Sequence, residues 1–361
     1  MRADLPASIA AAIDRCERPS LVFDLARIEA NARALAEAAR AARVTVLFAA
    51  KSFPRPEVRA IAARWFAGFD VASPAELAEV AALGSCAVVS VTDPTGRAGA
   101  AIPAAAARAI VGCETVDQVL AAPARAEIAI RLSASLAGRD PAVGAVQDGS
   151  GHRRSRFGLD TDLRRAIAEL AFAAAGRPVG LHVHHGAVAA TGAERFLATA
   201  RAALDAAASA GLTPRFLDLG GAWHAVPDVS GALRELRAAV PPALELIIEP
   251  GRAVAAGAGF ACGRVTLARE LADRPLRVVD LSRLCHLRWS HVELIGRSPP
   301  HARSTLFVGP TCFEEDSLGE WSVEPPPVGA RVAVRNVSGY AVAWNTGFGG
   351  VPPADVVLVE P

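Results

Sequence analysis

The chain has 361 residues, of which 52% are apolar and 21% are charged, and its formal net charge is +1. Such a balance gives no indication of a nucleic-acid-binding surface. No apolar run reaches the roughly 18 residues that a membrane span requires, and the six cysteines have no paired or metal-binding spacing, so the sequence predicts a cytoplasmic protein without a metal site.

Aliphatic runs and alanine-rich helical stretches alternate through the first two-thirds of the chain. The runs are almost continuously apolar, which is typical of parallel strands that are buried on both faces. We expect strands at 44–49, 68–73, 86–92, 108–113, 127–132, 178–186, 215–221 and 244–252, and helices at 55–66, 74–84, 115–124 and 192–211. This number of β–α units predicts a (β/α)8 TIM-like barrel over residues 21–260.

The pattern changes after residue 260. Short strand-like segments such as "ARVAVRNVSGYAVAWN" are separated by proline and glycine turns, and no helical pattern accompanies them. They predict a C-terminal all-β domain at 261–361, on which we expect the N-terminal segment 1–20 to pack. The glycine-rich, charged stretch at 134–155 is expected to be a mobile loop.

Lys51 follows the first expected barrel strand and is the only lysine among 38 basic residues. Lysine and arginine replace one another at many surface positions, but only an amine can lose its proton and attack a carbonyl group. The alternative interpretation is that one exposed lysine survived by chance. The residues at the ends of the other strands bear on this choice.

Polar residues also lie at the carboxyl ends of other expected strands, where barrels carry their chemistry. They are Asp70, His182, His184, His185, Gly220, Gly221 and the segment 249–252, which contains Glu249, Gly251 and Arg252. Singly, each has an ordinary structural explanation, such as a tight turn for the glycine pair. Together, an amine, two acids, an imidazole, a glycine turn and an arginine match the needs of pyridoxal phosphate, which are a covalent anchor, phosphate ligands and a carboxylate for the pyridine nitrogen.

The chain resembles the barrel-type (fold type III) pyridoxal-phosphate-dependent decarboxylases, the group that contains ornithine, diaminopimelate and carboxynorspermidine decarboxylases. The segments that carry the resemblance follow the family order from about residue 20 onward; they are "FDVASPAEL", "SRFGLD", "HVHHG", "LDLGG", "EPGR", "GPTCFEED" and "SGYAV". The resemblance implies pyridoxal phosphate as the cofactor, an amino acid as the substrate, and a homodimer with shared active sites.

The resemblance also implies a role for each matching residue. Lys51 would bind the cofactor covalently beside Asp70, His184 would stack on its ring, and Glu249 would pair with its pyridine nitrogen. Cys312 would cross the dimer interface to protonate the substrate carbon. The remaining cofactor contacts would come from Arg131, Gly220, Gly221, Gly251, Arg252 and Tyr340, and Glu76 matches a further site carboxylate.

Four positions depart from the family pattern. Ala187 replaces a phosphate-binding serine, Ala222 replaces the third glycine of the phosphate loop, and "FGG" at 348–350 replaces FNG. Phe313 follows Cys312, where an acidic residue commonly binds the far end of the substrate. We therefore expect a divergent member that acts on a carboxynorspermidine-like, diamino-acid or specialised-metabolite (siderophore) intermediate. In this interpretation a distal amine of the substrate would be bound by Glu314, Glu315 and Asp316. A distal carboxylate would instead be bound by His286 or Arg288.

Two other functions remain open on the same scaffold. One is an amino-acid racemase or lyase. A racemase of this scaffold uses a tyrosine as its base, but Tyr340 is the only tyrosine of the chain and is already assigned to the phosphate, which argues against racemization. The other is a non-catalytic regulatory protein like the antizyme inhibitors, against which the retention of Lys51, Glu249, Arg252 and Cys312 argues.

Overall fold

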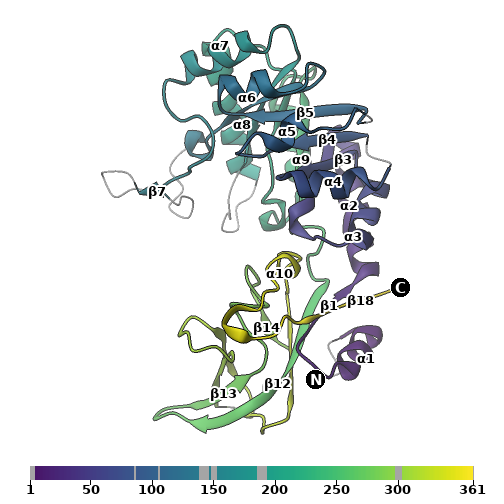
Figure 1. The fold of residues 1–361 in the computed structure, drawn as a ribbon, viewed down its shortest axis with the longest axis vertical. Helices are drawn as coiled ribbons and strands as arrows, with labels where there is room; N and C mark the ends of the chain where they lie inside the picture. The colour runs from purple at the N-terminus through teal and green to yellow at the C-terminus, as the bar shows by residue number, and fades with distance from the viewer. Residues whose placement is uncertain are drawn as a thin grey trace. The chain divides into compact units, whose positions relative to one another are not determined.

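A computed structural model describes residues 5–84, 87–104, 106–137, 146–147, 153–184, 193–296 and 303–360. The chain forms two compact units. One consists of Ala32–Lys51 and Arg59–Ala253, and the other of Met1–Asn31, Ser52–Val58 and Val254–Pro361. We call them the barrel unit and the β unit. Figure 1 shows both units, and each is described by itself below.

The barrel unit contains a closed parallel barrel, as the sequence predicts. Its strands follow one another in the order β10-β11-β2-β3-β4-β5-β6-β9, and β9 pairs with β10 to close the ring. They are β2 (Val44–Ala49), β3 (Gly68–Val71), β4 (Val88–Val91), β5 (Arg108–Cys113), β6 (Glu127–Leu132), β9 (Val179–Val183), β10 (Phe216–Asp218) and β11 (Glu245–Ile248). Apolar side chains fill its centre, including Leu47, Ile110, Phe216 and Ile247.

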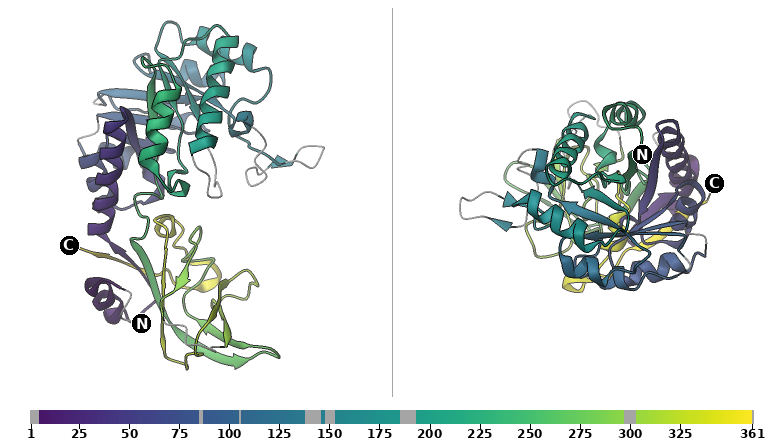
Figure 2. Two further views of the ribbon diagram at one scale, coloured as in Figure 1. Left: turned by 180° about the vertical axis from the view of Figure 1, so that it is seen from behind. Right: turned by 90° about the horizontal axis from the view of Figure 1, so that it is seen from above.

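Helices surround this ring of strands, as the right-hand view of Figure 2 shows. They are α2 (Leu25–Ala41), α3 (Pro56–Trp65), α4 (Pro74–Ala81), α5 (Arg97–Ala100), α6 (Val116–Ala121), α7 (Leu163–Ala173), α8 (Ala193–Ser209) and α9 (Val229–Ala239). Helix α4 begins at Pro74 because the Ser73 hydroxyl accepts a hydrogen bond from the Glu76 N–H at 3.2 Å. Short 3₁₀ turns follow two strands, at Ala50–Ser52 and Trp223–Ala225.

The expected loop at 134–155 lies only partly within the described residues. Its described parts are a 3₁₀ turn at Ala134–Ala137 and two short antiparallel strands, β7 (Val146–Gln147) and β8 (Arg153–Arg154). Residues 185–192, which include Ala187 and most of the "HHG" segment, lie outside the described residues. The same is true of Cys86 at the start of the expected strand 86–92.

The β unit is built on one mixed sheet. The path β14-β17-β12-β13-β15-β16 is extended by β1, which pairs antiparallel with β12 and parallel with β18. The strands are β1 (Ser20–Asp24), β12 (Gly259–Glu270), β13 (Pro275–Val279), β14 (Glu293–Leu294), β15 (Ser304–Val308), β16 (Ser317–Ser322), β17 (Arg331–Arg335) and β18 (Asp355–Val359). A single short helix, α10 (Tyr340–Ala343), and a 3₁₀ turn at Phe348–Gly350 follow β17 among the described residues.

The N-terminal helix α1 (Ala7–Arg15) packs on this sheet. Its apolar face (Ile9, Ala12 and Ile13) joins a buried cluster with Phe260 and Cys262 of β12. The expected barrel range of 21–260 is therefore too long at both ends, since β1 and the start of β12 pair with each other in the β unit. No described helix is long and apolar enough to cross a membrane.

Candidate active site

Lys51 lies in the 3₁₀ turn that follows β2, at the carboxyl end of the barrel. Its Nζ is 2.6 Å from Oδ2 of Asp70, which is the third residue of β3 and is completely buried. The other oxygen of Asp70 accepts a hydrogen bond from the Thr92 hydroxyl at 2.9 Å. Burial and then the charge of Glu249 raise the pKa of Asp70, although the Lys51 ammonium opposes both effects.

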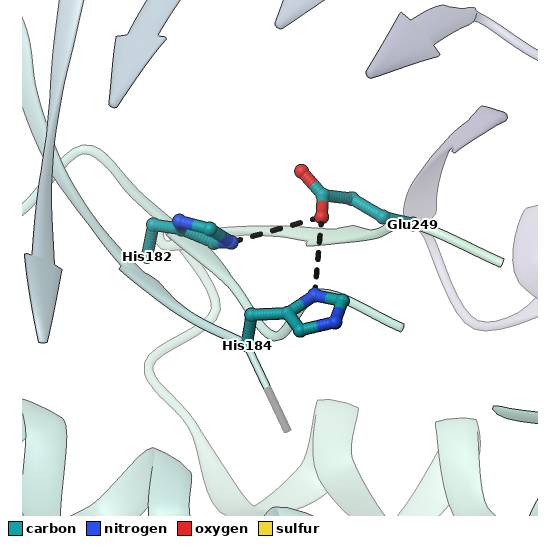
Figure 3. A group of neighbouring side chains, drawn as sticks. All are labelled: His182, His184 and Glu249. Atoms are coloured by element: carbon teal, nitrogen blue, oxygen red, sulfur yellow. Dashed lines mark ion pairs between the residues drawn. The ribbon is translucent and has the colours of Figure 1, made fainter. Parts of the chain in front are cut away.

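Glu249 follows β11 and is also buried, and two imidazoles from β9 flank it (Figure 3). Its Oε2 is 3.6 Å from Nε2 of His182 and 3.6 Å from Nδ1 of His184. Burial acts to raise the pKa of Glu249, but His182, His184 and Lys51 outweigh it and hold the pKa well below its usual range. The carboxylate is therefore ionised. Its Oε1 has no hydrogen-bond partner among the described residues.

The His184 ring is 31% exposed, so one part of it remains accessible. Burial lowers the pKa of His184, and the neighbouring Glu249 opposes this shift only in part. The Nδ1 atom accepts a hydrogen bond from the Gly221 N–H at 3.2 Å, so this atom carries no proton. His184 is a neutral, partly open aromatic surface.

The turn at Gly220 and Gly221 needs glycine because it lies against the His184 ring. Gly220 has a φ of +61°, and a Cβ there would be 2.6 Å from Nδ1 of His184. The Gly220 N–H donates to Oδ1 of Asp218 at 2.8 Å, and the Gly220 carbonyl accepts from the Glu249 N–H at 2.8 Å. Both glycine N–H groups thus have protein acceptors. The role that the structure shows for them is to make room for His184 and to tie it to Glu249.

Ala222 continues this turn with a φ of +71°, in the left-handed region where the resemblance predicts a third glycine. The chain therefore keeps the backbone conformation without the residue that adopts it most easily. The Trp223 indole stabilises the turn by donating from Nε1 to the Gly220 carbonyl at 2.9 Å, and its ring stacks on Phe196 at 4.2 Å.

Three other expected site residues of the barrel unit have definite neighbours. Arg131 on β6 donates to Oε1 of Glu114 at 3.2 Å, and its guanidinium lies 4.4 Å from the centre of the Phe157 ring. Glu76 accepts the Ala72 N–H at 2.8 Å and so closes the first turn of α4. Arg252 follows Gly251 after β11, and its Nη1 is 3.4 Å from Nε2 of His224.

The β unit carries Tyr340 and Cys312. Tyr340 begins α10 and meets the Trp289 ring edge-on at 5.0 Å. Cys312 is exposed, and so are the following residues Phe313, Glu314 and Glu315. Phe313 lies 5.1 Å from Phe348, so the two departures from the family pattern in this unit are neighbours.

Two of the residues expected to bind the substrate are structural. Asp316 is buried, and its carboxylate accepts from the hydroxyls of Ser282 and Thr311 and from the backbone N–H of Arg283 at 2.6 Å. His286 is completely buried; its Nδ1 accepts the Ser282 N–H at 3.0 Å, and its Nε2 is 3.0 Å from the Pro352 carbonyl. The polar atoms of both residues are thus bonded within the β unit. Arg288 stacks on Trp344 at 4.7 Å.

The sequence interpretation gave no role to His182 or Asp218, yet both are buried beside Glu249. Their positions contain the missed signal. His182 lies on β9 and His184 one residue beyond its end, and both imidazoles lie 3.6 Å from Oε2 of Glu249. Asp218 ends the neighbouring strand opposite His182.

These residues fit pyridoxal phosphate. A buried, ionised carboxylate with one unpartnered oxygen suits a protonated pyridine nitrogen, and Lys51 provides an amine in the same part of the barrel. The accessible ring of neutral His184 provides a flat surface beside Glu249.

Comparison with known proteins agrees with this fit. Residues 25–256 match the family described as "Pyridoxal-dependent decarboxylase, pyridoxal binding domain". Diaminopimelate decarboxylase of Pseudomonas aeruginosa is 28% identical over 371 residues, which cover 96% of this chain and 89% of that enzyme. Diaminopimelate decarboxylase of Actinosynnema pretiosum is 30% identical over 374 residues, covering 93% and 83% respectively.

Solved structures share the fold at lower sequence identity. Arginine decarboxylase of Paramecium bursaria Chlorella virus superposes with a TM-score of 0.79 at 18% identity, over 97% of this chain and 98% of that one. Lysine/ornithine decarboxylase of Vibrio vulnificus, in complex with putrescine, gives a TM-score of 0.77 at 19% identity, over 97% and 96%.

Proposed function

We propose a substrate class and a set of residue roles for this chain, which belongs to the pyridoxal-dependent decarboxylase family and is a pyridoxal-phosphate-dependent amino-acid decarboxylase. The observation that carries the proposal is the pairing of Lys51 with Asp70 beside a buried glutamate that has one open oxygen. When bound, the cofactor supplies an electron sink for the carbon–carbon bond that breaks.

Lys51 is the proposed attachment point for the cofactor. An ammonium is not a nucleophile, so Nζ must first lose a proton. Oδ2 of Asp70, at 2.6 Å, is placed to accept it, and the raised pKa of this buried carboxyl makes the transfer easier than it would be to an exposed aspartate. The chain thus contains both the amine and the group that activates it.

Glu249 and His184 are proposed to orient the cofactor ring. The open Oε1 of Glu249 would accept a hydrogen bond from the pyridine nitrogen and keep it protonated, because this carboxylate remains ionised. The neutral His184 ring would lie against the cofactor ring without adding a charge. Arg252, Gly251 and Tyr340 are the proposed phosphate ligands, as the family resemblance implies.

Cys312 is proposed to give its thiol proton to the carbon that has lost carbon dioxide. Its exposure in the β unit agrees with a role toward the active site of a second subunit, as the resemblance implies. The protein would then be a homodimer in which each site uses residues from both chains. Soluble, amino-acid-sized substrates would reach such a site directly.

The proposed substrate is an amino acid with a distal amine, of the carboxynorspermidine-like, diamino-acid or specialised-metabolite type. Glu314 and Glu315 follow Cys312 and are exposed carboxylates that can bind an ammonium group. The matching relatives are named diaminopimelate decarboxylases, whose name describes a diamino acid. A distal carboxylate on the substrate has less support, because His286, one of its two expected ligands, is buried and hydrogen-bonded within the β unit.

Release of carbon dioxide from matched pairs of amino acids tests this substrate class. Lysine and ornithine should be turned over in preference to norleucine and norvaline, which have nearly the same length but lack the second amine. The double variant Glu314→Gln/Glu315→Gln should lose this preference, since a neutral amide does not attract an ammonium group as a carboxylate does. Equal turnover of lysine and norleucine by the unmodified enzyme would overturn the proposed substrate class while leaving the decarboxylase activity intact.

A further inference from the structure

His182 is a buried, titratable residue that the proposed roles leave unused. It lies on β9 with only 2% of its side chain exposed, and its Cα is in register with Asp218 of β10 and Arg131 of β6. Neither ring nitrogen has a hydrogen-bond partner at normal distance among the described residues. A buried polar group without a partner destabilises the fold, and an aliphatic strand residue would avoid this cost. The presence of a histidine at this buried position therefore requires an explanation.

Glu249 is an acceptor that lies close to His182. Nε2 of His182 is 3.6 Å from Oε2, slightly beyond hydrogen-bond distance, and both side chains are 2% exposed (Figure 3). Nδ1 of His184 lies at the same distance from Oε2, but it accepts the Gly221 N–H and so has no proton to donate. Of the two imidazoles beside Oε2, only His182 can therefore donate a hydrogen bond to it.

The two oxygens of Glu249 are thereby distinguished. Oε2 faces His182, whereas Oε1 has no partner among the described residues and is the atom that suits the pyridine nitrogen. We propose that His182 is a positioning residue whose Nε2–H holds Oε2 of Glu249 and so directs Oε1 toward the cofactor ring. This inference rests on the proposed role of Glu249 and concerns the same site.

Other charged groups also face Glu249, and they define what His182 contributes. Asp70 from β3 is an acid whose negative charge would repel the carboxylate, and Lys51 after β2 is a cation that forms an ion pair with Asp70. Asp218 from β10 also lies beside Glu249, and burial and then the charge of Glu249 raise the pKa of Asp218 well above its usual range. After burial, His182 has the largest effect on the pKa of Glu249, and this effect lowers it.

Removal of His182 should therefore change the pH range of activity in a defined direction. Glu249 acts as the carboxylate, so activity falls when the pH drops through its pKa. Without His182 this pKa rises, and the acid limb of the kcat profile should move to higher pH, by about one unit if a single hydrogen bond to a charged group is lost. At the optimum, kcat should fall at least about tenfold while KM changes little.

Four variants separate this role from simple packing. His182→Leu removes the donor, and His182→Gln can place an amide N–H near the position of Nε2. His182→Asn is one methylene shorter and cannot reach it. Thr199→Val is the matched control, because Thr199 on α8 is another buried residue whose polar atom has no hydrogen-bond partner among the described residues. For each holoenzyme we would measure the cofactor absorption band, the cofactor dissociation constant and the pH dependence of kcat.

We expect the leucine and asparagine variants to bind the cofactor with a shifted absorption band, lowered kcat and a raised acid limb. The glutamine and Thr199→Val variants should resemble the unmodified enzyme. If the leucine variant does not fold, the comparison of glutamine with asparagine decides the question. Equal behaviour of the glutamine and asparagine variants, or an unchanged acid limb in a folded leucine variant, would overturn the role of His182. Failure of the unmodified chain to bind the cofactor at Lys51 would instead overturn the proposed function.

Discussion

At the residue scale, Lys51 and Glu249 carry opposite charges in one buried neighbourhood. The ammonium of Lys51 is held by Asp70 at 2.6 Å, and Glu249 lies between two imidazoles. In a site of low polarity, each charge affects the protonation of the others more strongly than it would in water. This explains why the two acids next to each other differ, with the pKa of Asp70 raised and that of Glu249 lowered.

Replacing Glu249 by glutamine tests whether its charge matters for the reaction. Glu249→Gln keeps the size of the side chain, so we expect the cofactor to bind with little change. The neutral amide cannot keep the pyridine nitrogen protonated, and kcat should fall about 10²-fold or more. Steady-state kinetics and a titration with pyridoxal phosphate measure the two effects separately. Unchanged turnover would show that Glu249 serves the structure only.

Site residues were easiest to propose from the sequence where few other residue types could perform the same chemistry. Lys51, Asp70, His184 and Glu249 lie together in the barrel unit as expected. Asp316 and His286 are different, because a polar residue in a β-rich segment can either face solvent or join a buried network, and both join one. Only the fold shows that the Asp316 carboxylate satisfies donors from two separate loops.

At the scale of the elements, the two ends of the barrel differ in function: one end carries the candidate active site and the other carries an ion-pair network. The first residues of three strands, Arg108, Glu127 and Glu245, form one ion-pair network at the end opposite Lys51. The Arg108 guanidinium donates to both carboxylates, and the Thr45 hydroxyl also donates to Glu245 at 2.8 Å. Since the carboxyl ends hold the site, this network serves the stability of the barrel.

Removing Arg108 should therefore lower stability and leave catalysis unchanged. Arg108→Met keeps the aliphatic part of the side chain, but it leaves two neighbouring, partly buried carboxylates without a cation. We expect a loss of about 2 kcal/mol, which is less than the roughly 3–5 kcal/mol of a broken, fully buried pair because the three side chains are partly exposed. Thermal unfolding should show a midpoint several degrees lower, with kcat/KM unaltered.

The control for this change is Arg165→Met. Arg165 pairs with Glu169 on α7 at 2.7 Å, but both side chains are largely exposed, so the thermal midpoint should hardly move. If Arg108→Met and Arg165→Met had the same midpoint, the network at the strand starts would contribute nothing special to the barrel.

Strand β1 shows that the sequence of a strand does not reveal which other strands it pairs with. "SLVFD" is a short apolar run, and its burial equals that of the barrel strands. This composition is typical of a buried strand, but it holds no information about the partners. The partners are β12, at residues 259–262, and β18, at residues 355–359, both more than two hundred positions away in the chain. For this reason the barrel and the all-β domain were predicted correctly while their boundary at the N-terminus was not.

At the scale of the whole molecule, the proposed homodimer makes a quantitative prediction. If each site uses Lys51 of one chain and Cys312 of the other, Lys51→Ala and Cys312→Ala should each be nearly inactive. Mixed in equal amounts and allowed to exchange, they form mixed dimers in half of all cases, each with one intact site of two. About a quarter of the unmodified activity should then return.

Subunit exchange must be followed separately, for example by pull-down of a tagged chain with its untagged partner. Recovery of activity should rise in step with the mixed dimer. Complete exchange without any recovery would mean that Cys312 acts within its own chain or not at all.

The most direct test of the central claim is to locate the cofactor. The chain contains a single lysine, so Lys51 and the amino group at the start of the chain are its only primary amines. The enzyme loaded with pyridoxal phosphate would be reduced with borohydride, digested and analysed by mass spectrometry, with Lys51→Arg as the control, since arginine keeps the charge but cannot form the link. We predict one cofactor per chain, on the Lys51 peptide, and none on the folded arginine variant. A fully active enzyme whose Lys51 peptide carries no cofactor would contradict the account.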